Sequence, residues 1–359
     1  LAKAIEMIAQ SPSPDRERTL ELHRRIAGLC LRGRELEVGL EKIEPALELS
    51  EGLGRDEYVA RFSLAKGLLL TASNRFAEAD PWFERARQVA KNAGHVELLG
   101  EIARGGAEGR ARNGDNEEAA TLLEEALELA DATGDVAAQR RALVPLALAY
   151  GGKGDGAAAR EALARVEATL EDQPERIVEC ELWKTDSLVA FLTGNLQRAL
   201  DSAYRALDLA KEYGFPYEAA VNAHNIGETL MRMGDFKRAF AMLRYSYDLT
   251  REHGFLKLQY NNMRVLGYID AVKLKSPQGR DRVAEALQHA EEHSYVWDTI
   301  QSLHMLAMVD HSLGDQESAR ALFQRVLRMA NEHGHAHYAA AAETALEALA
   351  AGKPVPRAH

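Results

Sequence analysis

The chain has 359 residues, of which 46% are hydrophobic but only 6% aromatic, and its 55 acidic and 44 basic residues give a formal net charge of −11. That acidic balance argues against nonspecific binding to nucleic acid, because phosphates would be repelled. The sequence shows no run of 18 apolar residues and no signal-type start, so we expect no membrane partner and a cytoplasmic protein. Two cysteines, Cys30 and Cys180, are too few for a disulfide framework or a zinc site.

The sequence repeats itself every 40 residues across eight consecutive units. One recurring feature is a glycine followed by an acidic or amide residue, at Gly114-Asp115, Gly154-Asp155, Gly194-Asn195, Gly234-Asp235 and Gly314-Asp315. Five positions beyond that glycine, every unit has a small residue, namely Gly39, Ala79, Ala119, Ala159, Ala199, Ala239, Gly279 and Ala319. A fixed period with recurring small residues predicts stacked pairs of closely packed helices.

Each unit is predicted to hold two helices, which we call helix A and helix B. Segments such as 116–132 and 196–213 place apolar residues three and four positions apart and are rich in good helix formers. The Gly-Asp pair marks the turn from A to B. A second glycine marks the turn from B to the next A, at Gly54, Gly94, Gly134, Gly214, Gly254 and Gly334, with Pro174 and Ser294 in the two other units.

In chain order, residues 1–14 are predicted to be the end of a truncated upstream repeat, and residues 15–334 to be the eight tandem repeats. The segment from Lys273 to Gly279 replaces the Gly-Asp turn of the seventh unit, so we expect a turn of different shape there. Residues 335–351 are predicted to form a C-terminal capping helix, and residues 352–359 a tail. Because the chain starts inside a repeat and has no initiator methionine, we expect a fragment of a larger signalling or regulatory protein.

These features resemble the tetratricopeptide repeat, whose motif has a small residue on helix A, Gly-Asp or Gly-Asn at the turn, and two alanines seven positions apart on helix B. The second of those alanine positions is held here by Ala46, Ala86, Ala126, Val166, Ala206, Ser246, Ala286 and Val326. The family's usual period is about 34 residues, and the longer unit resembles sensor regions of bacterial MalT-type signal-transduction regulators. The resemblance implies an all-α fold, a right-handed α-solenoid of antiparallel helix pairs with about eight repeats and a capping helix.

In the family that the chain resembles, helices A line a concave groove that binds the ligand. One groove-facing position is mostly basic here, and apolar or aromatic residues join it in units four to eight. Aromatic and methionine side chains beside arginine are typical of interface hot spots. The predicted partner-binding groove therefore comprises Arg104, Lys184, Leu188, Phe191, His224, Met231, Arg264, Tyr268, His304 and Met308.

Two alternative interpretations of these residues stay open. The basic side chains can pair internally with glutamates on neighbouring helical turns, such as Glu181 and Glu228, which would neutralise the surface. The apolar side chains can pack between adjacent A helices instead of meeting a partner.

One motif suggests metal chemistry. The segment from His289 to His293 matches the H-x-x-E-H zinc pattern. However, His293 shares its repeat position with His253 and His333, at the end of a helix B, where a cationic residue is favourable. We therefore expect no catalytic residue, no metal, no cofactor and no enzymatic activity.

The sequence thus predicts a protein–protein interaction scaffold that binds a partner protein or peptide, an acidic one included, in its concave groove. The alternative is a ligand-sensing regulatory module of a bacterial transcription regulator or kinase. A structural self-assembly domain is a third possibility, which would place apolar residues on the outer face of helices B. The sequence makes no prediction of the oligomeric state.

Overall fold

The computed structural model describes residues 16–33, 36–73, 75–112, 114–333 and 335–355, which form 17 α-helices and no strand. The predicted all-α fold of paired helices is confirmed. The predicted end of an upstream repeat, residues 1–14, lies outside the described residues. None of the described helices combines the length and the apolar composition that crossing a bilayer requires.

The chain divides into two compact units, Leu1–Lys153 and Gly154–His359, and the boundary falls in the glycine-rich turn Gly151–Gly156. In the first unit the A helices are α2 (Arg16–Gly33), α4 (Asp56–Ala72), α6 (Val96–Arg112) and α8 (Val136–Gly152), and the B helices are α3 (Leu36–Gly52), α5 (Phe76–Ala93) and α7 (Asn116–Thr133).

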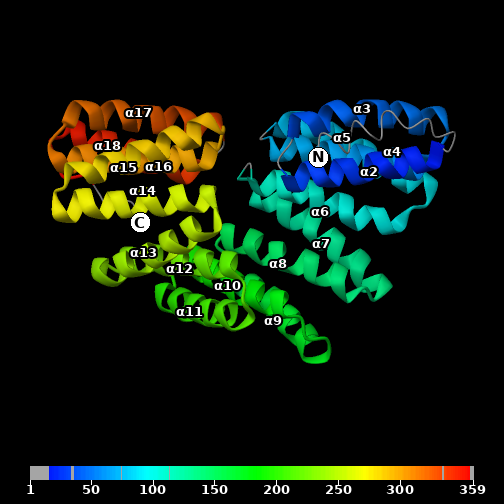
Figure 1. Ribbon diagram of the computed structural model, residues 1–359, viewed down its shortest axis with the longest axis horizontal. Helices are drawn as coiled ribbons and strands as arrows, with labels where there is room; N and C mark the ends of the chain where they lie inside the picture. The colour runs from blue at the N-terminus through cyan, green and yellow to red at the C-terminus, as the bar shows by residue number, and fades with distance from the viewer. Residues whose placement is uncertain (1–15, 34–35, 74, 113, 334, 356–359) are drawn as a thin grey trace. The chain divides into compact units, whose positions relative to one another are not determined.

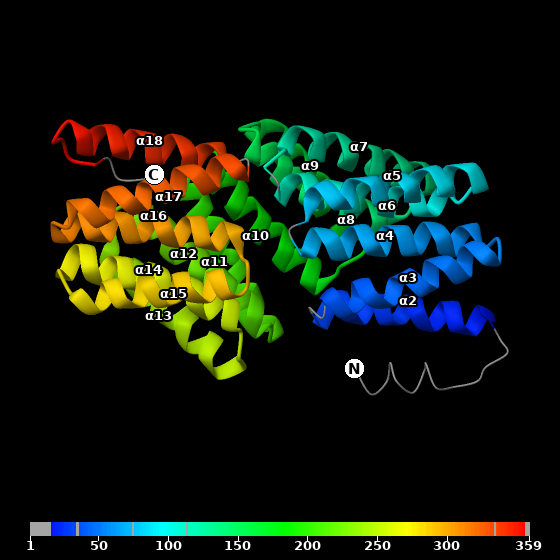
Figure 2. The same cartoon turned by 90° about the horizontal axis from the view of Figure 1, so that it is seen from above.

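In the second unit the A helices are α10 (Arg176–Leu192), α12 (Pro216–Arg232), α14 (Leu256–Leu274) and α16 (Val296–Leu313). The B helices are α9 (Gly156–Asp172), α11 (Leu196–Tyr213), α13 (Phe236–His253), α15 (Pro277–Glu292) and α17 (Gln316–Glu332), and α18 (Ala336–Ala350) follows the last of them. Figure 1 shows these helices along the chain, and Figure 2 shows them turned by 90°.

Within each unit the A helices form a layer of their own. Each A helix packs against the next one, α2 on α4 on α6 on α8 in the first unit, and α10 on α12 on α14 on α16 on α18 in the second. In the described part of the chain, by contrast, the backbones of neighbouring B helices do not approach closely, and these helices meet only through long side chains such as Arg87 with Glu125. We call the surface formed by the A helices the A face.

The turns from B to A follow the glycine column. Gly94, Gly134, Gly214 and Gly254 adopt left-handed backbone, with φ between 69° and 75°, a conformation that glycine takes without a steric penalty. Ser294 takes the same conformation, with a φ of 54°. Gly54 is left-handed too, with a φ of 61°. The turn at Pro174 differs, because proline has its φ fixed near −65°. Around Pro174 the flanking residues Gln173 and Glu175 are extended, with φ values of −133° and −143°.

The turns from A to B are closed by side-chain caps. The side-chain oxygens of Asp115, Asp155, Asn195, Asp235 and Asp315 accept hydrogen bonds from backbone N–H groups in the first turn of each B helix. The seventh unit has the different turn that was predicted: α14 runs one or two residues further than the other A helices, and Lys275 takes the left-handed conformation, with a φ of 54°.

The small residues lie where helices A and B touch. Ala119, Ala159, Ala199, Ala239 and Ala319 are fully buried. In the fifth unit the Ser187 hydroxyl on α10 donates a 2.8 Å hydrogen bond to the Ala199 carbonyl on α11. In the seventh, a Cβ atom added to Gly279 would lie 2.5 Å from the Gly267 carbonyl oxygen. The two backbones are therefore in direct contact, and a larger side chain has no space.

We expect Ala199→Phe to lower the free energy of unfolding by at least about 1–3 kcal/mol, because the ring would force α10 and α11 apart. Urea unfolding followed by circular dichroism would measure the change. Asp201→Phe is the matched control, since Asp201 is exposed on the same helix. Equal unfolding midpoints for the two variants would contradict the close contact at Ala199.

Candidate binding surface of the second unit

Four basic residues of the predicted groove lie in a row on the A face of the second unit. Lys184, His224, Arg264 and His304 occupy the same position of α10, α12, α14 and α16, and these helices pack in that order. Arg104 lies on α6 in the first unit, where it lines a pocket of about 280 Å³ together with Arg61, Glu101 and Arg141.

Carboxylates from the next A helix compensate two of these cations. The Lys184 ammonium lies 3.0 Å from a Glu218 carboxylate oxygen, and the two side chains are only 21% and 12% exposed. Arg264 is 2% exposed, and its Nη1 lies 3.3 Å from the Asn261 side-chain oxygen and 3.8 Å from an Asp298 oxygen. A cation this deeply buried requires such partners, since an isolated buried charge is very costly.

The internal pairing left open above is thus present, in part with a predicted partner and in part with others. Glu228, one turn along the same helix, lies next to His224 as predicted, whereas Glu218 and Asp298 each come 34 residues after their cation. The same offset relates His304 to Tyr338, whose rings are 5.7 Å apart. A 34-residue spacing between opposite charges was the sequence signal that could have found these pairs.

His224 is held between two hydrogen-bonding groups. Its Nδ1 donates to the Asn262 side-chain oxygen at 2.9 Å, and its Nε2 lies 3.5 Å from a Glu228 oxygen. Burial acts to lower the pKa of His224, but the attraction of Glu228 outweighs burial, so the pKa is raised. Burial likewise acts to raise the pKa of Glu228, but His224 and then Arg264 lower it below its ordinary value.

His304 has a different character from the rest of the row. It is 5% exposed, packs edge-to-face against Phe323 and Tyr338, and neither ring nitrogen has a hydrogen-bond partner among the described residues. Burial, with a smaller contribution from His337, lowers the pKa of His304 to about 4. At neutral pH His304 is therefore uncharged, and it is not the cationic group that its repeat position suggested.

The apolar members of the predicted groove divide into two groups. Leu188, Phe191, Met231 and Tyr268 are half-buried on the A helices, so each keeps some surface for a partner. The Arg232 guanidinium lies 4.4 Å from the centre of the Phe191 ring. Met308 is 8% exposed and belongs to the core of α16 and α17. For Met308, packing between helices is the interpretation that the structure favours.

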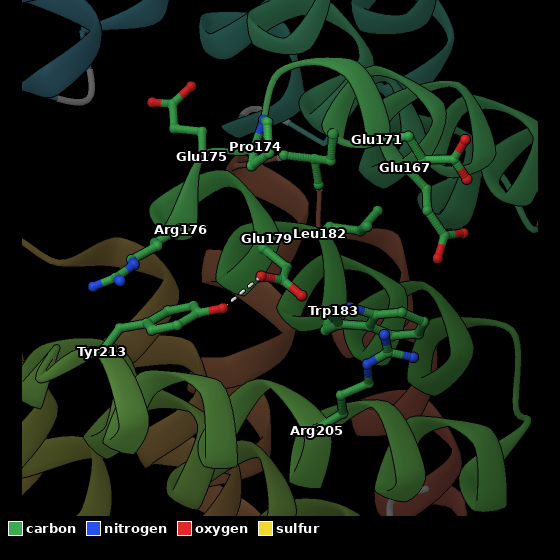
Figure 3. Close-up of a pocket in the computed structure, with 11 residues that line it drawn as sticks. Glu167, Glu171, Pro174, Glu175, Arg176, Glu179, Leu182, Trp183, Arg205 and Tyr213 are labelled. Atoms are coloured by element: carbon green, nitrogen blue, oxygen red, sulfur yellow. Dashed lines mark hydrogen bonds between the residues drawn. The ribbon is translucent and has the colours of Figure 1, made fainter.

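A pocket that sequence reasoning missed lies at the turn between α9 and α10. It has a volume of about 440 Å³ and is lined by acidic and aromatic side chains, with Glu167 and Glu171 on α9, Glu179 and Trp183 on α10 and Tyr213 on α11. Figure 3 shows the hydrogen bond of 2.8 Å that the Tyr213 hydroxyl donates to Glu179. The Arg205 guanidinium covers the Trp183 ring at 3.6 Å. The feature of the sequence that could have indicated this pocket is Pro174, which replaces glycine at this turn.

The histidines of the zinc pattern are engaged in ring contacts. His289 stacks on Tyr260 with 3.8 Å between ring centres, and the centre of His293 lies 4.2 Å from that of His289. The Nδ1 of His293 donates to the His289 carbonyl at 2.9 Å. Over the described residues, no group of three potential metal ligands comes together.

The comparison with known proteins agrees with the repeat register. A family model described as Tetratricopeptide repeat matches residues 299–333, which span most of α16 and α17 and so cover one A–B pair. No curated protein matches the sequence.

Solved structures share the fold at low sequence identity. The apo form of the quorum sensor NprR from B. thuringiensis is 14% identical, with 89% of each chain covered and a TM-score of 0.61. The Rap conjugation gene regulator of plasmid pLS20, in complex with the Phr* peptide, is 11% identical, with 89% of this chain and 97% of that chain covered and a TM-score of 0.60. A signal-transduction ATPase with a tetratricopeptide repeat sensor from Pyrococcus horikoshii is 16% identical, with a TM-score of 0.57. The alignment covers 96% of this chain but only 51% of the ATPase, so this chain spans about half the length of that protein.

Helix pairs stacked at a fixed period define an α-solenoid of helix-turn-helix repeats. Within that class, residues 299–333 match the tetratricopeptide repeat, and the similar structures share the fold over most of this chain.

We expect the buried His304 to make the protein less stable in mild acid. The folded-state pKa of about 4 lies below the ordinary 6.5, so the unfolded state binds the proton first and stability falls as the pH drops from 6.5 towards 4. Between pH 7 and pH 5 the loss from this group is on the order of 2 kcal/mol.

Urea unfolding at both pH values would measure this loss, with His304→Gln expected to lose about 2 kcal/mol less than the unsubstituted protein. His253→Gln is the control, because His253 is exposed. If His304→Gln and the unsubstituted protein lost the same stability, His304 would not be buried in its neutral form.

Proposed function

We propose that this chain is a regulatory module that binds a protein or peptide on the A face of its second unit and performs no chemistry itself. One observation carries the proposal: Leu188, Phe191, Met231 and Tyr268 form a half-buried apolar row on three consecutive A helices, next to polar side chains. An apolar row flanked by polar groups gives a ligand both burial and orientation.

The packing of the helices supports this surface as a groove. The backbones of neighbouring A helices approach closely, while those of neighbouring B helices lie farther apart. A stack whose members are closer on one side curves towards that side, which supports the A face as the concave one. An extended peptide lying across α10, α12 and α14 would then meet side chains from each helix in turn.

The similar structures include proteins whose ligands are peptides. The Rap regulator of plasmid pLS20 is bound to the Phr* peptide, and NprR is a quorum sensor. A peptide ligand for this chain follows by analogy with proteins of the same fold. Since those relatives are bacterial regulators, we propose a cytoplasmic, bacterial role for this chain as well.

The charges of the A face limit which ligand fits. Lys184 and Arg264 already have carboxylate neighbours, and His304 is neutral. The most exposed cation of the row is Lys184, so an acidic group of the ligand would compete with Glu218 for it. Most of the binding energy would come from apolar side chains placed against Tyr268 and Leu188.

The second candidate is a ligand-sensing module of a larger regulator. This candidate is favoured by the similarity to the signal-transduction ATPase, of which this chain spans about half (51%). In that arrangement the ligand on the A face would alter the state of an attached effector domain.

We expect Tyr268→Ala to weaken peptide binding by about thirtyfold, or about 2 kcal/mol, as truncation of a central anchor does. A random peptide library displayed on phage would supply a binder, and fluorescence anisotropy would measure its affinity for each variant. Tyr245→Ala is the matched control, because Tyr245 is 37% exposed on the B helix α13. Unchanged affinity in Tyr268→Ala together with a loss in Tyr245→Ala would place the site away from the A face.

A further inference from the structure

A second surface with binding character lies at the edge of the second unit where each B helix ends and the next A helix begins. In a stack of helix pairs, all these turns lie at the same end of the helices. Here the turns follow α11, α13, α15 and α17. We call this surface the BA edge, and it is separate from the row of side chains in the middle of the A helices.

The BA edge is covered by aromatic rings in mutual contact. Tyr217 packs edge-to-face on Phe255 at 5.1 Å, and Trp297 packs on His335 and Tyr338 at 5.0 and 5.3 Å. The stack of Tyr260, His289, His293 and Tyr295 lies between these two groups. Tyr217 is 51% exposed, Trp297 is 48% exposed, and Leu256 beside them is 59% exposed. Large apolar groups gathered at the surface in this way mark interaction sites.

Exposed glutamates accompany the rings at the repeat period. Glu212, Glu252, Glu292 and Glu332 lie in the last turn of α11, α13, α15 and α17. The helix dipole favours a cation, not a carboxylate, at the carboxyl end of a helix, so helix stability does not explain these four glutamates. Only Glu292 has a side-chain partner in the described structure, the neutral amide of Gln288 at 2.8 Å.

The cations near this edge already have partners. Lys211 lies over the Tyr245 ring at 5.1 Å, and Arg251 lies over the Tyr247 ring at 5.9 Å. The Lys257 ammonium is 3.1 Å from Asp298 and lies over the Tyr295 ring of the edge itself at 4.7 Å, as a basic side chain of a partner would. The glutamate carboxylates therefore face solvent beside the aromatic rings without a compensating cation.

The same edge of the first unit lacks this combination. The positions equivalent to Phe255 and Tyr295 are Arg55, His95 and Asp135, and those equivalent to Tyr217 and Trp297 include Glu57 and Glu97. The repeat framework alone therefore does not require the aromatic side chains.

We propose that the BA edge of the second unit binds an arginine-rich or lysine-rich segment of a partner protein. An aromatic face and a nearby carboxylate are the two groups that one arginine side chain engages, by stacking and by ion pairing. Helices in contact are about 8–10 Å apart, and an extended chain advances about 3.3 Å per residue. A basic residue at every third position therefore matches successive turns. The glutamates would repel nucleic acid phosphates and anionic lipids.

The test uses a fluorescein-labelled peptide of four Arg-Ser-Gly repeats, with a Glu-Ser-Gly peptide as the charge control. Fluorescence anisotropy would show binding of the arginine peptide alone, weakening as salt is added. Tyr217→Ala and Trp297→Ala should each weaken it about threefold and the double variant about tenfold, since the two rings are separate.

Two matched variants separate this surface from the rest of the unit. Glu292→Lys should weaken binding about threefold and reduce its salt dependence. Glu317→Lys makes the same charge change at the start of α17, at the opposite edge, and should leave binding unchanged. Tyr268→Ala should also leave binding of the arginine peptide unchanged. Failure of the BA-edge proposal and failure of the peptide site on the A face are therefore distinguishable.

Three results would overturn the proposal. One is equal affinity of the double variant and the unsubstituted protein, with both shown to be folded by circular dichroism. Another is equally tight binding of the glutamate peptide. The third is Trp297-dependent binding to phosphatidylserine–phosphatidylcholine vesicles without binding of the arginine peptide, which would assign the edge to a membrane surface instead.

Discussion

Contact between the backbones of paired helices is the constraint on which the rest of this structure depends. At Ala199 the carbonyl of one helix accepts a hydrogen bond from Ser187 of its partner, and at Gly279 not even a Cβ atom would fit. Helices can approach this closely only where side chains are small. Because the small residue recurs at one position of every repeat, each pair packs in the same way, and the same positions of successive A helices fall into rows.

Those rows determine how charge is distributed on the A face. A residue and the one 34 positions later meet across two neighbouring A helices, which gives Lys184 its partner Glu218 and brings Asp298 to Arg264. The pairing turns a position that is basic in the sequence into a largely compensated surface. It also leaves His304 among apolar rings, where the neutral form is the stable one. Apolar contact, with Lys184 as an accessible cation, is then the principal means of recognition that this face offers.

The A face and the BA edge of the second unit are chemically distinct. Its A face combines paired charges with half-exposed apolar side chains, and its BA edge combines exposed rings with carboxylates. The pocket at Pro174 is a third feature, created where the regular left-handed turn is replaced by extended backbone. Each arises from a few substitutions on a constant framework, because residues that do not hold the helices together are free to differ between repeats.

The sequence by itself determined the helix pairs, their register and the shape of nearly every turn. A left-handed turn demands glycine or a tolerant residue, and a close helix contact demands a small one, so single positions such as Gly134 and Ala199 identify the structure locally. The sequence also selected the A-helix row that contains Lys184 and Arg264. Only the tertiary structure decided that Arg264, His224, His304 and Met308 are buried, which carboxylates pair with the cations, and that rings from four turns gather at one edge. These outcomes depend on which residues of different helices meet in space, and the distance along the chain does not specify that until the helices are packed.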